Sequence, residues 1–250
     1  MKKSTVKYIV GGSMVGFGIL LIFIAVCIGG WDTLFNFGGV TIDWDGIHYY
    51  DNDSNEFFLP GGSEIMDKDD IKKLNIEMEY GKLIIKTDDV DKIKVDTKNI
   101  ISNRFSCDQT GDTIKIRYRG GFSFFTWKSD SEITVTLPKD MSFEKVFIAN
   151  GAGKTDIKNI TSDEISMENG AGESTLTDIY AKDKLYLENG AGAITMKKIN
   201  CGKIEFSGGV GEINAEEVIC SGLSVEAGVG SFKFSGEING NADIDNGIGE

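Results

Sequence analysis

The chain has 250 residues, enough for one elongated domain or two small ones. Its 32 glycines accompany only 2 prolines, which argues against a collagen-like or disordered chain, and 40% hydrophobic residues suffice for a core. The 39 acidic residues outnumber the 26 basic ones and give a formal net charge of −13, which disfavours nucleic acid and anionic lipid as partners and leaves cations and cationic peptides open.

The first predicted element is a membrane-spanning helix. Residues 8–28 carry no charged side chain, and at about 1.5 Å per residue they span roughly the 30 Å of a bilayer core. The lysines of residues 1–7 precede this segment, so the positive-inside rule places the N-terminus in the cytoplasm. We therefore predict a cytoplasmic tail over 1–7, a single-pass anchor over 8–30 in the cell membrane, and an extracytoplasmic C-terminal domain.

Removal of the anchor is the alternative. A signal peptidase site needs a small-x-small motif, and a lipoprotein site needs a small residue before its cysteine. Val26 precedes Cys27, and the apolar run is longer than a usual signal core, so the sequence favours an uncleaved anchor. Residues 31–71 follow as a connector without clear periodicity.

The second half of the chain carries a glycine-punctuated repeat. Its length is nearly constant at about 19 residues, because motifs of the Asn-Gly-Ala-Gly type begin at Asn150, Asn169, Asn189, Gly208, Ala227 and Asn246. Alternating apolar pairs flank each motif, a pattern typical of strands with one inward face. Such a short unit cannot bury its own face, but equivalent strands stacked at about 4.8 Å bury a continuous column. We therefore predict an all-β fold, a single-stranded β-solenoid (β-helix) of about 19-residue coils.

Each position of the repeat has an expected role. The glycines are expected at corners that need φ > 0 or close backbone approach. The asparagines share the parity of the inward residues and are expected to hydrogen-bond along the stack as a ladder. The third motif position is also expected to face inward: Ala152, Ala171, Ala191, Val210, Val229 and Ile248. The structural repeat residues are Asn150, Gly151, Gly153, Asn169, Gly170, Gly172, Asn189, Gly190, Gly192, Asn246, Gly247 and Gly249.

A weaker form of the same spacing reaches upstream. Leu74 and Ile93 begin apolar pairs that are separated by one repeat length, as do Ile114 and Ile133. We expect roughly nine coils in all, irregular over 72–149 and regular over 150–250.

This layout resembles a known family. The N-terminal anchor is followed by an L-x-I…G-x-L-x-I…I-x-V segment from Leu74, the I-T-V-T-L-P strand of 133–138 and the Asn-Gly-Ala-Gly units. Together they resemble the bacterial "putative adhesin" family of membrane-anchored β-strand-repeat proteins, a domain of unknown function. The resemblance covers about residues 72–250. It implies a β-solenoid ectodomain in a bacterial envelope, commonly Gram-positive, with a link to envelope stress, and it transfers no catalytic residue.

The sequence does not favour catalysis. The glycine motifs lie between strands rather than before a helix, so neither a phosphate loop nor a cofactor is expected. The one histidine, His48, lies in the connector, which makes a Ser-His or Cys-His pair on the solenoid difficult to build. A β-helix carbohydrate-active enzyme stays an alternative, although it needs clustered carboxylates between long loops and the coils are nearly loop-free.

One column of acidic residues suggests a metal site. Glu168 and Glu188 precede neighbouring motifs, and Glu226 and Asp245 resume the column after Ser207. Like charges stacked about 4.8 Å apart are unfavourable without a counterion. Weak divalent-cation binding is one hypothesis. The favoured hypothesis is that these side chains point into water and that nearby lysines compensate their charge.

Cys201 and Cys220 occupy equivalent places in consecutive units. Stacked strands would bring their Cα atoms to about 5 Å, within the range of a disulfide. An oxidising exterior permits that bond, and two free thiols are the equally weighted alternative.

An irregular segment concentrates four aromatic residues, Phe122, Phe124, Phe125 and Trp127. An exposed patch would bind a partner, a glycan or the membrane surface. A cap over an open end or an enlarged core is the favoured interpretation.

These observations lead to a functional hypothesis. We expect a non-enzymatic surface or binding module of the bacterial cell envelope, whose partner is an envelope protein or a cell-wall glycan. The alternative is a structural spacer that self-associates through its C-terminal coil, because the last unit stops halfway round a coil and exposes a strand edge.

Overall fold

The computed structural model describes most of the chain beyond residue 61 and short strands before it. The described ranges are 35–37, 40–43, 46–49, 58–59, 62–101, 104–119 and 131–249. Their regular elements are the strands β1 to β13, which confirms the predicted all-β class. No helix within these ranges is long and apolar enough to cross a membrane, and the anchor expected over 8–30 lies outside them.

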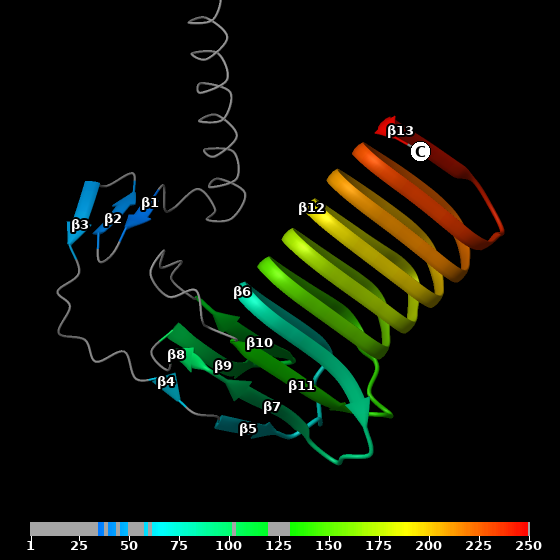
Figure 1. The fold of residues 1–250 in the computed structure, drawn as a ribbon. Coiled ribbons are helices and arrows are strands. Elements are labelled where there is room, and N and C mark those ends of the chain that lie inside the picture. The colour runs from blue at the N-terminus through cyan, green and yellow to red at the C-terminus, as the bar shows by residue number, and fades with distance from the viewer. Residues whose placement is uncertain are drawn as a thin grey trace, which may run out of the picture. The chain divides into compact units, whose positions relative to one another are not determined.

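A small antiparallel sheet forms a unit of its own within residues 1–54. Its strands are β1 (Phe35–Phe37), β2 (Val40–Asp43) and β3 (Gly46–Tyr49), in the order β1-β2-β3 (Figure 1). Each strand pairs with the next along the chain, as short connections require.

The second unit begins with an irregular sheet, in which β6 is central. The first half of β6 pairs in parallel with β10, and its second half pairs in parallel with β11. β7 and β9 run antiparallel to β11 and β10, while β5 lies antiparallel to β7 and β4 to β8. The bounds are β4 (Phe58–Leu59), β5 (Gly62–Met66), β6 (Lys73–Asp88), β7 (Ile93–Lys98), β8 (Ile100–Ile101), β9 (Phe105–Thr110), β10 (Thr113–Tyr118) and β11 (Glu132–Pro138).

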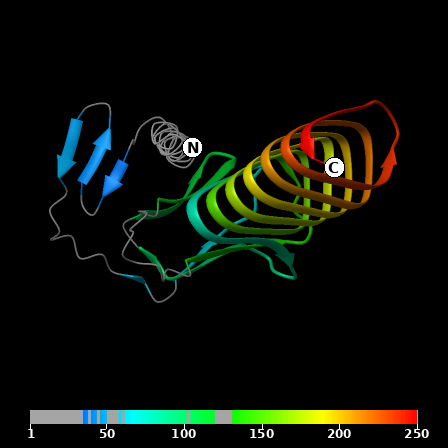
Figure 2. The ribbon, with the colours of Figure 1, turned by 45° about the horizontal axis from the view of Figure 1, so that its top comes forward.

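The rest of the unit is a stack of coils. β12 (Phe143–Ile238) winds as one continuous strand through successive turns, and β13 (Ala242–Gly249) adds the last one (Figures 1 and 2). β6 forms the first turn, because Val146 lies in parallel register with Leu74 and Ile157 with Ile85. At the other end Leu223 lies in register with Ala242, its equivalent in the next repeat.

The core is the apolar column inside these turns. The inward residues before each motif are at most 4% exposed in five consecutive turns: Ile148, Met167, Leu187, Phe206 and Val225. Each such side chain contributes about 1.5–3 kcal/mol on removal from water. The column continues into the irregular sheet through Ile76, Ile116 and Val135, so both parts share one core.

The expectation of coils of the repeat length over the whole of 72–149 is wrong for the described residues between 89 and 138. Ile114 lies in register with Leu74, whereas the strand of Ile93 pairs with β11 and β5. A two-residue turn at Gly111 and Asp112, where Gly111 has a φ of 60°, reverses the chain between β9 and β10. A hairpin of this kind imposes antiparallel pairing, so the apolar spacing alone did not determine the winding.

Candidate functional site

The glycines of each motif lie where one turn touches the next. A Cβ atom on Gly170, the first glycine of its motif, would lie 2.3 Å from the carbonyl oxygen of Gly151 in the preceding turn. Gly172, the second glycine, has a φ of 133°, and its Cβ would lie 1.9 Å from the Gly153 oxygen. Both positions therefore require glycine, the first for space and the second also for its backbone conformation.

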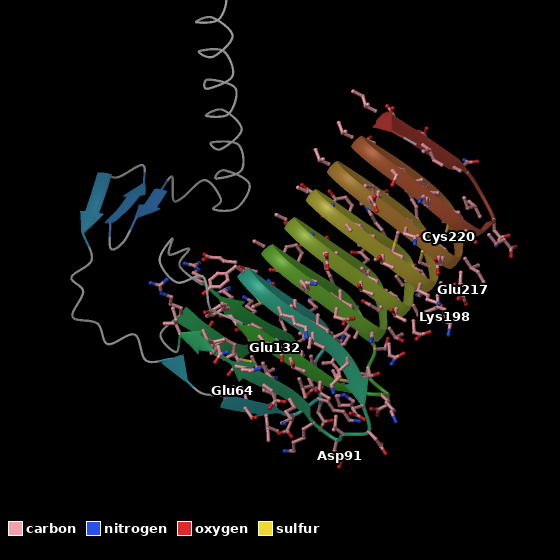
Figure 3. All side chains as sticks on the ribbon, in the orientation of Figure 1. Glu64, Asp91, Glu132, Lys198, Glu217 and Cys220 are labelled. Carbon is pink, nitrogen blue, oxygen red and sulfur yellow. The ribbon has the colours of Figure 1, made fainter. Side chains whose placement is uncertain are left out.

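A second corner is formed without glycine in four consecutive turns. Asn159, Asp178, Lys198 and Glu217 adopt φ values of 54° to 56°, one residue per turn. Asparagine and aspartate tolerate this left-handed conformation, whereas for lysine and glutamate it costs about 1–2 kcal/mol. Sequence reasoning missed this corner, although Asn159 and Asp178 at equivalent positions of consecutive repeats were a usable signal. Figure 3 shows Lys198 and Glu217 at the outside of neighbouring turns.

The asparagines of three motifs are buried, but they form only one rung of the expected ladder. Asn169 Nδ2 donates to Asn189 Oδ1 at 2.8 Å. Asn150 Nδ2 instead donates to Thr155 Oγ1 at 2.9 Å, which leaves the oxygens of Asn150 and Asn169 buried without a partner. The side chain of Asn246 lies outside the described residues.

The third motif position is not buried as expected: Ala152 and Ala171 are half-buried, and the later residues are exposed. Val210 is 56% exposed, Val229 46% and Ile248 72%, and the equivalent Ala191 is exposed as well. The reason is the corner itself, where the alternation of the strand breaks. Val229 and Ile248 lie in register on neighbouring turns. We call Val210, Val229 and Ile248 the corner row.

Outward charges on early turns pair across the stack. Lys154 Nζ lies 2.8 Å from Glu173 Oε2, and Lys145 Nζ lies 3.7 Å from Glu164 Oε2, each pair at equivalent positions of consecutive turns. Residues 143–203 contain eight lysines and nine acidic residues, whereas residues 204–249 contain one lysine and eight acidic residues. In the part of the chain that the structure describes, no ion pair involves a residue beyond Glu217. The last turns therefore present uncompensated negative charge.

The described residues contain no group of three or more His, Cys, Asp or Glu able to hold a metal ion, and the weak divalent-cation site at the acidic column stays a prediction. Burial raises the pKa of the Glu168 carboxyl, and the nearby Glu188 raises it further. Glu188 Oε2 accepts a hydrogen bond from the Tyr186 hydroxyl at 2.9 Å. At the far end Glu226 lies in register with Asp245, a like-charge pair.

Cys201 and Cys220 are free thiols in the structure. They are 5% and 1% exposed, and burial raises the pKa of Cys201 to about 12, with Cys220 adding to the effect. Burial also raises the pKa of Cys220. Thiols so protonated and enclosed are poor nucleophiles.

A polar groove of about 620 Å³ runs along one side of the last turns. It is hollowed where Gly202 and Gly222 carry no side chain, and Lys182, Lys203 and Asp243 are among its lining residues. Its volume is in the range of small-ligand sites. The aromatic cluster of Phe122, Phe124, Phe125 and Trp127 lies outside the described residues.

Comparisons with known proteins show which family and which solved structures this chain is similar to. The family model described as Toastrack DUF4097 matches residues 71–249. The structure of a "putative cell adhesion protein" from Clostridium sporogenes is 15% identical, covers 76% of this chain and 99% of its own, and has a TM-score of 0.42. The structure of a "putative adhesin" from Bacteroides fragilis is 14% identical, covers 76% of this chain and 94% of its own, and has a TM-score of 0.43. The structure of a "Putative lipid binding protein" from Parabacteroides distasonis is 17% identical, covers 76% of this chain and 96% of its own, and has a TM-score of 0.37.

No curated protein matches the chain. The three structural likenesses are too distant to carry an argument about function. The family resemblance expected from the sequence is confirmed.

Proposed function

Because the chain belongs to the Toastrack DUF4097 family, we propose that its β domain is a non-enzymatic binding module on the outer face of a bacterial cell membrane. The observation that carries this proposal is the corner row. Three branched apolar side chains, Val210, Val229 and Ile248, are about half exposed or more at equivalent corners. Single exposed apolar residues need no explanation, but a row repeated on successive turns is typical of an interaction surface.

The surroundings of the corner row support binding rather than incomplete packing. The flanking motif positions are glycines, among them Gly209, Gly211 and Gly230, so the chain neighbours of each row residue add no side chain beside it. The row is built on stacked turns held by backbone pairing, and a rigid support reduces the entropy that binding costs. An apolar segment of an envelope protein is the partner that such a surface fits.

The membrane setting rests on the sequence. The uncharged segment 8–28, preceded by lysines, supports a single-pass anchor with a cytoplasmic N-terminus. A cell-wall glycan is the second partner class, and the polar groove beside Gly202 and Gly222 offers it hydrogen-bonding side chains. The resemblance adds the link to envelope stress.

Proximity labelling on intact cells tests the proposal. A labelling enzyme is fused to the C-terminus of the full chain, and the row variant Val210→Thr, Val229→Thr and Ile248→Thr is compared with wild type. Ile219→Thr is the matched control, because Ile219 is also exposed (47%) but lies outside the row. We expect the row variant to lose labelling of specific envelope proteins several-fold while the control retains it.

Two outcomes would contradict this account. Labelling of cytoplasmic proteins alone would show that the topology is reversed. Unchanged labelling by the row variant would show that the corner row does not bind.

A structural spacer is the second candidate, and one observation favours it. β13 is the last strand of its sheet and pairs only with β12 among the described residues. An open edge of this kind is a template for a second copy. A concentration-dependent oligomer of the full chain in detergent, together with no labelled partner on cells, would favour the spacer over the binding module.

A further inference from the structure

The last described turn has a strand edge with which no described strand pairs, and apolar side chains that are only partly buried. Seven residue pairs join β13 to β12, from Ala242 opposite Leu223 to Gly249 opposite Gly230. No described strand pairs with the other edge of β13. Backbone N–H and C=O groups along an edge strand accept an added strand readily, and alternate side chains of that strand then set its specificity.

The apolar side chains of this turn show where an added strand would bury apolar surface. Ile244 lies in register with Val225, which is 1% exposed under its neighbours, yet Ile244 itself is 51% exposed. Phe232 and Phe234, with ring centroids 6.3 Å apart, are only partly buried against the core of the same turn. An apolar side chain placed over Ile244 would continue the inward column by one more layer.

The charges of β13 indicate which kind of strand would pair with its outer edge. The residues on either side of Ile244 are Asp243 and Asp245, both exposed, and Asp245 already lies in register with Glu226. In earlier turns an acid is matched by a lysine on the adjacent turn, as in Lys154 with Glu173. No ion pair joins Asp243 or Asp245 to a cation among the described residues, so lysine or arginine side chains of an added strand can pair with them.

The same charges disfavour a second copy of this edge. If two β13 strands paired antiparallel with Ile244 opposite Ile244, each Asp243 would face an Asp245 of the other strand. If they paired in parallel register, each aspartate would lie beside its own equivalent. Like charges directly opposite each other destabilise a strand pair.

We propose that the outer edge of β13 binds an extended cationic strand of a partner protein, in which an apolar residue covers Ile244 and flanking lysine or arginine side chains pair with Asp243 and Asp245. This inference rests on the proposed function and names the class of partner for one end of the stack. The corner row reaches the same turn through Ile248, so one partner strand can contact both surfaces.

A peptide probe tests the proposal on the full chain in zwitterionic detergent. The probe is a fluorescent peptide of residues 242–249 carrying Asp243→Lys and Asp245→Lys, and the matched control is the unmodified peptide of the same residues. A third peptide has the composition of the probe with its two lysines adjacent, which breaks the alternation. Fluorescence anisotropy measures each dissociation constant, and a photo-crosslinker on the probe locates its site.

We expect the lysine probe to bind about tenfold more tightly than either other peptide, and to weaken as salt rises. The charge-swapped chain with Asp243→Lys and Asp245→Lys should reverse the preference and select the unmodified peptide. Crosslinks should map to residues 242–249.

Other results would overturn the inference. Tighter binding of the unmodified peptide would assign the edge to a second copy, and equal binding of all three would remove any role for charge. No binding of the probe at millimolar concentration would reject the site. None of these outcomes affects the labelling of partners through the corner row on cells, so the proposed function stands or falls separately.

Discussion

The stacked turns of β12 and β13 and the irregular sheet of β5 to β11 share one apolar core but wind differently. Ile114 and Ile116 in the irregular sheet are as buried as Leu185 and Leu187 in the turns. What differs is the corner: the turns bend at a glycine pair that touches the turn before, whereas β9 and β10 reverse at Gly111. The apolar pairs therefore bury a face in either arrangement, and the corner chemistry decides whether the next strand runs parallel or antiparallel.

Replacing one glycine in each region tests this difference between the two kinds of corner. We expect Gly172→Ala to lower the free energy of unfolding by about 4 kcal/mol, because its φ is 133° and its new Cβ would lie 1.9 Å from a carbonyl oxygen. Gly111→Ala should cost only about 1 kcal/mol, since Gly111 has a φ of 60° and nothing lies within 4 Å of the added atom. Urea unfolding in detergent measures both, and equal losses would contradict the role given to the glycine pair.

Removing one buried hydrogen-bonding side chain from each region should give a smaller difference in stability. Asn169→Ala removes the donor to Asn189 Oδ1 in the turns and should cost about 2 kcal/mol, because it leaves a buried acceptor unsatisfied. Ser131→Ala in the irregular sheet removes the hydroxyl that donates to the Asn99 carbonyl at 2.8 Å, and should cost about 1 kcal/mol. The same urea titration checks both. A neutral Asn169→Ala would show that the single rung adds no stability.

The buried thiols should make both regions sensitive to alkaline pH. An unfolded thiol ionises near its ordinary pKa of 9.0, whereas burial holds the pKa of Cys201 at about 12. Stability is therefore lost as the pH rises above 9, by at most about 1.4 kcal/mol per pH unit for one thiol. Cys201→Ala should reduce that loss between pH 9 and 11.

Cys107 extends this test to the irregular sheet. Burial raises its pKa to about 12, with Glu64 and Asp108 adding to the effect, so Cys107→Ala should relieve the alkaline loss in the same direction. Stability curves against pH for the two variants and wild type provide the measurement. Identical curves for Cys201→Ala and wild type would show that this thiol is not enclosed, or that it is already oxidised.

The repeat spacing made the stacked turns predictable, because glycine at a fixed interval between strands indicates a corner at the same place in each turn. The inward pairs followed from alternation, and Leu187, Phe206 and Val225 are buried as expected. The irregular sheet was not predictable from the spacing of its apolar pairs. Its apolar pairs at Ile93 and Ile114 keep the repeat spacing relative to Leu74 and Ile133, although their strands pair in other orders.

The corner row shows why the surface was harder to predict than the core. Asn150 and Thr155 are both buried but lie an odd number of positions apart, so the alternation must break once between them. The sequence does not show at which residue it breaks, and alanine at position 152 is compatible with either side. Only the backbone positions show that the third motif residue faces outward, which turns Val210 and Val229 from core candidates into candidate binding residues.

The most direct test of the account is disulfide crosslinking in a chain whose native cysteines are alanines. Lys154→Cys with Glu173→Cys joins neighbouring turns, and Lys82→Cys with Glu132→Cys joins β6 to β11. Lys94→Cys with Thr113→Cys has the same sequence separation as the first pair, but its strands are not paired. We predict that the first two pairs crosslink under mild oxidation and that the third does not. A crosslink between 94 and 113, or its absence between 154 and 173, would contradict the division into stacked turns and irregular sheet.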